Sequence, residues 1–212
     1  GYGGLYIPPR CQPENCLHHH KYSVKMYSWT QFTIPEIPPN IYKWFSTNND
    51  VDSPIITPIP FGIPDWTHDI ISNSTMVEKD IDVYVNFQPN TNERVGLIRY
   101  FKNMTNAIVI KEPVSPEDYV SHLLRSKIVI SPPGNGFSCY RTLESLYCGA
   151  TPVITDTSNW TKAYDNLPVA RTNNLSQLTS VNFSLQDLDG TPADFSFWRS
   201  TIAKYKSHLL VL

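Results

Sequence analysis

Short runs rich in β-branched residues alternate with amphipathic stretches from about residue 80 onward, and this alternation limits the possible folds more than any other feature. It is typical of βαβ units, in which helices connect the strands of a parallel sheet. The runs at residues 81–87, 107–110, 127–131 and 151–155 predict strands. We therefore expect an α/β fold, a Rossmann-like parallel sheet with helices on both faces.

The strongest helix signal follows the second of these runs. Ser115 precedes Pro116 and Glu117, which places a serine at the N-cap and a proline at the first helical position. Tyr119, Val120, Leu123 and Leu124 then form an apolar face at helical spacing. The other expected elements are helices at 92–103, 140–148, 158–165 and 195–210 and a short strand at 167–170.

Prolines divide the chain into two parts. The 212 residues include 18 prolines and only 9 glycines, and the prolines crowd the first 65 positions. Proline fixes φ and removes a hydrogen-bond donor, so such a segment favours extended stretches and turns. We expect an irregular Pro-rich segment over residues 1–65 and a Rossmann-like domain over residues 66–212.

Charge and hydropathy limit the partners. Lysines and arginines number 17 against 19 aspartates and glutamates, and this balance argues against nucleic acid as a partner. No apolar run reaches the length of a membrane span, and neither a signal peptide nor a marked excess of glycosylation sequons is recognisable. The chain as given is expected to be soluble. The sequence does not decide the compartment, although a cytoplasmic location is favoured over secretion. Because the chain begins with Gly1, it also stays open whether the chain is a fragment.

One cysteine and histidine cluster has the composition of a zinc site. Cys11 and Cys16 are followed by His18, His19 and His20, but no second ligand pair follows at a suitable spacing. We favour a polar terminal segment and expect no metal.

The loop after the third predicted strand carries the main binding signal. Two prolines stiffen its start, and Gly134 and Gly136 allow a close approach of backbone to a ligand, with Asn135 and Phe137 beside them. Ser138 is expected to cap the following helix. Ligands of open parallel sheets bind beyond the carboxyl ends of the strands, and helix N-termini attract anions, so this loop predicts a site for a diphosphate.

Two charged residues follow the loop on one helix face. Arg141 in the first helical turn is unfavourable for the helix dipole unless its guanidinium binds an anion, so it is a candidate diphosphate ligand. Glu144 lies one turn later and is suited to accept hydrogen bonds from a ribose diol. The alternative is an ordinary surface pair worth under about 1 kcal/mol.

Polar residues after the first strand are further candidates. Asn86, Thr91, Asn92 and Arg94 would face the diphosphate across the cleft, or would simply cap the loop. No catalytic base is assigned. Asp65, His68 and Glu112 are candidates for that role, and each also fits an ordinary surface position.

The segment SKIVISPPGNGFSCYRTLESLYCGATPVI, residues 126–154, resembles the nucleotide-sugar-binding segment of exostosin-like glycosyltransferases. The matching positions are Gly134, Gly136, Arg141, Glu144, Gly149 and Pro152. Weaker likenesses at 43–63 and 82–95 extend the resemblance over roughly residues 25–170. It implies the C-terminal donor domain of a GT-B enzyme, in which Arg141 would bind the diphosphate and Glu144 the ribose or sugar hydroxyls.

The resemblance also implies an activity in carbohydrate biosynthesis. The expected reaction is transfer of a sugar, such as a hexose, from a UDP- or GDP-linked donor to a glycan or glycoprotein hydroxyl, without a metal. The acceptor half is reduced to a remnant, so a partner domain or a homodimer would complete the cleft. Alternatives are a non-catalytic module that binds a nucleotide sugar or glycan, a fucosyltransferase-like enzyme and, ranked last, a flavodoxin-like regulatory or structural domain.

Overall fold

The computed structural model describes residues 41, 43–49, 51–105, 107–156 and 159–173. The chain divides after Phe32, and all of these residues belong to the unit Thr33–Leu212. The helix expected at 195–210 and the Cys11 and Cys16 cluster lie outside the described residues, and the predicted domain boundary at residue 65 stays a prediction.

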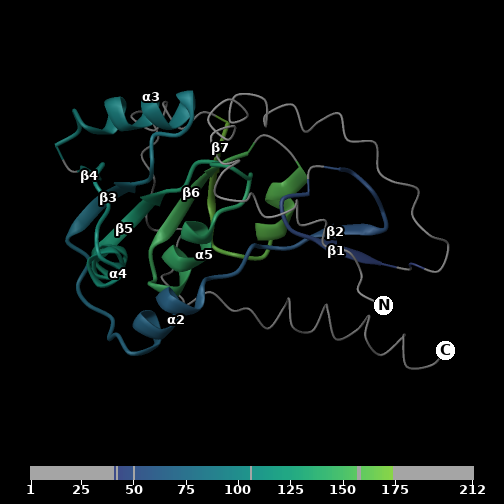
Figure 1. Cartoon of the computed structure of the whole chain (residues 1–212), viewed down its shortest axis with the longest axis horizontal. Helices are drawn as coiled ribbons and strands as arrows, with labels where there is room; N and C mark the ends of the chain where they lie inside the picture. The colour runs from purple at the N-terminus through teal and green to yellow at the C-terminus, as the bar shows by residue number, and fades with distance from the viewer. Residues whose placement is uncertain (1–40, 42, 50, 106, 157–158, 174–212) are drawn as a thin grey trace, which may run out of the picture. The chain divides into compact units, whose positions relative to one another are not determined.

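A five-stranded parallel sheet forms the centre of this unit, in the order β4-β3-β5-β6-β7 (Figure 1). Its strands are β3 (Ile81–Asn86), β4 (Ala107–Ile110), β5 (Ser126–Ile130), β6 (Thr151–Thr155) and β7 (Ala170–Thr172). Val83 of β3 is opposite Ala107 of β4 on one side and Ile128 of β5 on the other, which fixes the register of the central strands. The predicted α/β class and parallel sheet are confirmed.

Helices cover both faces of the sheet, because successive strand residues point to opposite sides. The helices are α2 (Asp65–Ser72), α3 (Asn92–Phe101), α4 (Pro116–Arg125) and α5 (Tyr140–Tyr147). Val85 and Ile130 pack with α3 on one face, whereas Tyr84 and Val129 pack with α4 on the other (Figure 1). No helix in the described part of the chain is long and apolar enough to cross a membrane.

The helix cap predicted before α4 is confirmed. Ser115 is the N-cap, its hydroxyl accepts the backbone N–H of Asp118 at 3.0 Å, and Pro116 occupies the first turn. The helix expected at 158–165 is present as the 3-10 helix η3 (Asn159–Tyr164). The short strand expected at 167–170 needs correction. It is Ala170–Thr172, because Leu167 packs into the η3 core and pairing with β6 begins only at Ala170.

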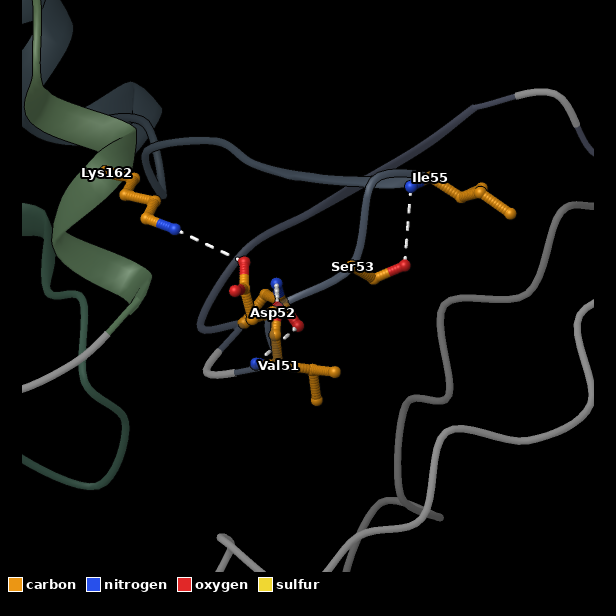
Figure 2. A network of polar contacts seen from close by, with 6 residues as sticks. Val51, Asp52, Ser53, Ile55 and Lys162 are labelled. Atoms are coloured by element: carbon orange, nitrogen blue, oxygen red, sulfur yellow. Dashed lines mark hydrogen bonds and ion pairs between the residues drawn. The ribbon is translucent and has the colours of Figure 1, made fainter.

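The Pro-rich segment is more regular than expected where the structure describes it. Strands β1 (Trp44–Ser46) and β2 (Ile56–Pro58) pair in parallel as a separate two-stranded sheet. Between them, Ser53 Oγ accepts the backbone N–H of Ile55, and Lys162 of η3 reaches the Asp52 carboxylate at 3.3 Å (Figure 2). The β1–β2 segment is therefore linked to the main sheet unit through η3.

Lys79 connects three elements at the amino edge of the sheet. Its ammonium donates to the carbonyls of Leu124, Ser126 and Cys148, at 3.0, 2.9 and 3.1 Å. Two of these carbonyls close the C-terminal turns of α4 and α5, where a cation complements the helix dipole. Burial lowers the pKa of Lys79 from its usual value.

Candidate functional site

The site lies where the strand order reverses. Strand β3 is followed in the chain by β4 on one side, while β5 lies on its other side. In open parallel sheets such a reversal creates a crevice between diverging loops at the carboxyl ends of the strands. A cavity of about 350 Å³ occupies this position. Its walls are Trp66, Asn86, Phe87, Gln88, Arg94, Lys111, Glu112, Pro113, Val114, Pro116, Tyr119, Cys139, Tyr140, Arg141 and Glu144.

Arg141 lies in the first turn of α5 and presents a cation to this cavity. Its Nε is buried and has no hydrogen-bond partner among the described residues, whereas Nη1 has only a weak 3.9 Å contact with Cys139 Sγ. The guanidinium carbon lies 5.5 Å from the centre of the Phe87 ring. A buried donor without a partner costs about 1–3 kcal/mol, and an anionic ligand with oxygen acceptors would remove that cost.

Glu144 lies deeper and is only 3% exposed. Its Oε1 accepts from the Thr67 hydroxyl at 2.9 Å and its Oε2 from the Tyr119 hydroxyl at 2.7 Å, so it joins α2, α4 and α5. Burial raises the pKa of Glu144, while these hydrogen bonds and the Arg141 charge lower it. The exposed Arg141–Glu144 surface pair is thus not formed, because the carboxylate is buried and bonded to two hydroxyls.

Arg94 braces the loop that follows β5. It is 6% exposed, and its guanidinium donates to the carbonyls of Pro133, Pro132 and Gln88. Its guanidinium carbon lies 5.3 Å from the centre of the Phe87 ring, so the guanidinium groups of Arg94 and Arg141 both contact this ring. Arg94 lines the cavity as expected, but these bonds fix its guanidinium to protein carbonyls.

The glycine-rich loop lies next to the cavity but does not form its wall. Gly134, Asn135, Gly136 and Phe137 do not line the cavity. A Cβ on Gly134 would collide with the Arg94 guanidinium, so the glycine makes room for this brace. Phe137 stacks on Trp160 of η3 at a centroid distance of 6.2 Å, and the exposed Asn135 accepts a hydrogen bond from Asn90.

The start of α5 differs from the prediction. Cys139, not Ser138, is the N-cap, and its side chain makes no capping hydrogen bond. The Ser138 hydroxyl pairs instead with the Tyr164 hydroxyl, because Ser138 is buried against η3. The backbone N–H of Ser138 donates to Asn48 Oδ1 and is therefore not available to a ligand. Tyr140 and Arg141 are the first two residues of α5, so their backbone N–H groups have no acceptor within the helix.

Of the remaining candidates after β3, one lines the cavity and two lie at the start of α3. Asn86 lines the cavity and donates to the Tyr84 hydroxyl at 2.8 Å. Thr91 is the N-cap of α3 and accepts the backbone N–H of Arg94, which is a capping role, and the exposed Asn92 begins that helix.

Of the three candidate bases, only Glu112 lines the cavity, whereas Asp65 and His68 lie on exposed parts of α2. The sequence contains Asp-x-Asp triplets at 50–52, 80–82 and 187–189. Asp80 and Asp82 pair with Arg125 and Lys127, away from the cavity. Among the described residues, no group of three or more His, Cys, Asp or Glu side chains could hold a metal.

Sequence reasoning missed the aromatic and cysteine components of the site. Phe87 and Cys139 follow the ends of β3 and β5, where position alone could have identified them. Tyr119 was expected on an apolar helix face, and its hydroxyl to Glu144 could not be foreseen. Trp66 comes from α2, an element absent from the predicted list.

A larger cavity of about 550 Å³ lies between α2 and α4. Three carboxylate residues line it, namely Glu78, Asp80 and Glu117, together with one cation, Arg125, that is already paired with Asp80. This balance disfavours an anionic ligand. The smaller cavity at the carboxyl edge is therefore the better candidate for a phosphate-bearing ligand.

The chain was compared with known families and proteins. No protein-family model matches it, and no curated protein matches it at significant similarity.

Proposed function

We propose that the cavity beyond β3 and β5 binds the diphosphate of a nucleotide sugar, and that the chain is the donor-binding part of a glycosyltransferase. The single observation that carries the proposal is Arg141, whose buried Nε has no partner among the described residues and lies in a cavity at the topological switch point. The resemblance of residues 126–154 to exostosin-like enzymes supports the same role, within a GT-B arrangement.

The proposed chemistry is transfer of a sugar to a hydroxyl. The bond between the anomeric carbon and the diphosphate oxygen breaks, the acceptor oxygen bonds to that carbon, and the acceptor proton leaves to a base. Arg141 offsets the charge that develops on the departing diphosphate. Glu112, at the cavity wall, is the base candidate that the geometry favours. Glu144 holds α2 and α4 around the site, and a ribose hydroxyl would compete with Thr67 and Tyr119 for its oxygens.

The test is nucleotide binding by calorimetry with UDP, GDP, CMP and their sugars. Arg141→Ala should weaken binding of the preferred nucleotide about 10- to 150-fold, the range for losing hydrogen bonds to a charged group. Arg141→Lys should recover only part, because an ammonium lacks the bidentate fork. Arg99→Ala removes an exposed arginine of α3 outside the cavity and is the matched control. Wild-type affinity in Arg141→Ala would overturn the proposal.

A second candidate is a module that binds the nucleotide sugar without turnover. The observation in its favour is that, among the described residues, Glu112 and Glu144 are the only carboxylate or imidazole side chains that line the cavity. The two functions are separated by donor turnover. Glu112→Gln should keep nucleotide affinity and abolish transfer if the chain is an enzyme, whereas a wild-type chain that binds donor and never consumes it, with acceptors supplied, is a binding module.

A further inference from the structure

Exposed aromatic side chains stand at the same cavity as Arg141. Trp66 of α2 is 52% exposed and Tyr140 of α5 is 44% exposed, and both line the cavity. Burying such rings releases more apolar surface from water than burying any other side chain, so leaving them exposed at a cavity favours a ligand that covers them.

Neighbouring contacts fix the helix turn that carries Trp66 and the ring of Tyr140. Thr67, directly after Trp66, donates its hydroxyl to Glu144 of α5, and this bond ties the first turn of α2 to α5. The Tyr140 ring meets the Phe61 ring edge to face, with centroids 4.7 Å apart and an interplanar angle of 86°. The Tyr140 ring, fixed in this way, loses little conformational freedom when a ligand stacks on it.

The cavity therefore has two chemically distinct parts. Arg141, at the second position of α5, offers a cation, and Tyr140, at the first, offers an aromatic surface. A volume of about 350 Å³ is at the small end of ligand cavities and suits one ligand of nucleotide size. A ligand that combines an anion with a flat ring a short distance away satisfies both parts.

We infer that Trp66 and Tyr140 form the stacking surface for the base of the nucleotide, and so make the site select nucleoside diphosphates over diphosphate alone. This inference rests on the proposed function. It adds two specificity residues to a site that otherwise recognises only charge. Stacking tolerates any base, because every base has a π-face, so these residues select a nucleotide without fixing which one.

The experiment compares two probes, a nucleoside diphosphate (UDP or GDP) and inorganic pyrophosphate, by calorimetry on the full chain. Trp66→Ala and Tyr140→Ala should each weaken nucleotide binding about 5- to 150-fold, the range for one stacked aromatic, and leave pyrophosphate binding unchanged. Tyr147→Ala is the matched control, since Tyr147 lies on the same helix with 42% exposure and does not line the cavity. Trp66→Phe and Tyr140→Phe keep a ring and should retain most of the affinity.

The outcomes separate this inference from the proposed function. Arg141→Ala should weaken both probes, whereas the two aromatic variants should weaken only the nucleotide. Equal affinity of wild type for the two probes, or unchanged nucleotide affinity in both aromatic variants, overturns the stacking surface and leaves the diphosphate site standing. A raised acceptor KM with unchanged nucleotide affinity would instead assign the rings to the acceptor. Failure of wild type to bind either probe overturns both proposals.

Discussion

The first turns of α3 and α5 face the same cavity and are built in opposite ways. In α3, Thr91 caps the helix, Glu93 complements the dipole, and the Arg94 guanidinium donates to protein carbonyls. In α5, the N-cap Cys139 forms no capping bond, no acidic residue follows in the first turn, and Arg141 Nε has no partner among the described residues. The α3 turn is completed by groups of the protein, whereas the described part of the chain supplies neither a side-chain cap for α5 nor a partner for Arg141 Nε.

The largest expected effect on stability comes from a variant that disrupts the first turn of α3. Arg94→Ala removes three charged hydrogen bonds and leaves buried carbonyls of the loop without a donor, so the free energy of unfolding should fall by about 3 kcal/mol. Urea denaturation measures this, with Arg99→Ala as the control, expected within about 0.5 kcal/mol of wild type. A loss below about 1 kcal/mol would mean that Arg94 does not brace the loop.

A smaller effect is expected at the cap of the same helix. Thr91→Ala removes the hydroxyl that accepts the Arg94 backbone N–H and should cost about 1 kcal/mol. Thr91→Ser keeps the acceptor and should remain near wild type in the same denaturation experiment. If serine and alanine destabilise equally, the cap is not the reason for the loss.

The corresponding change at α5 should have the opposite sign. Cys139→Asp supplies the missing cap and a negative charge at the helix start, and should stabilise the free protein by about 0.5 kcal/mol. The same charge should compete with a diphosphate for Arg141 and weaken UDP or GDP binding. Cys139→Ser separates the two effects, because it caps without a charge. Tighter nucleotide binding in the aspartate variant would contradict an anion site.

The smallest expected effect is a pH-dependent change in stability at Glu144, the residue that joins α5 to α2 and α4. Because burial raises the pKa of Glu144, its contribution to stability is fully present below the unfolded pKa of a glutamate and is lost as the pH rises through the folded value. Glu144→Gln keeps partners for Thr67 and Tyr119 without a charge. The variant should therefore gain stability relative to wild type as the pH increases from about 4 to 7. A constant difference over that range would show that Glu144 does not titrate with folding.

Much of the sheet could be predicted, because strand and helix periodicities repeat along the chain. Strand 107–110, strand 151–155 and the Ser115 cap lie where the sequence placed them. The site was predicted less completely. Arg141 could be identified as a candidate because a cation in the first turn of a helix is unfavourable for the helix dipole, and this signal is local in the sequence. The partners of Glu144, by contrast, are Thr67 and Tyr119, and their contacts depend on how three helices pack.

The glycine-rich loop shows why a motif does not reveal its own geometry. Its glycines were read as room for a ligand, and at Gly134 the space is taken by the Arg94 guanidinium from another helix. A sequence records that a small residue is needed at a position. It does not record which neighbour needs the space, because that neighbour lies forty positions away.

The Lys79 clamp has a consequence for how the molecule can respond to a ligand. By holding carbonyls at the ends of α4 and α5 and at the start of β5, one ammonium fixes the amino edge of the sheet, while the cavity lies at the opposite edge. Local opening, and with it the exchange of amide hydrogens for deuterium, should therefore be slow at the clamped edge and faster in the loops beyond β3 and β5. The proposed ligand would therefore meet the edge of the sheet that Lys79 does not hold, so any adjustment on binding is expected in the loops and not at the amino edge.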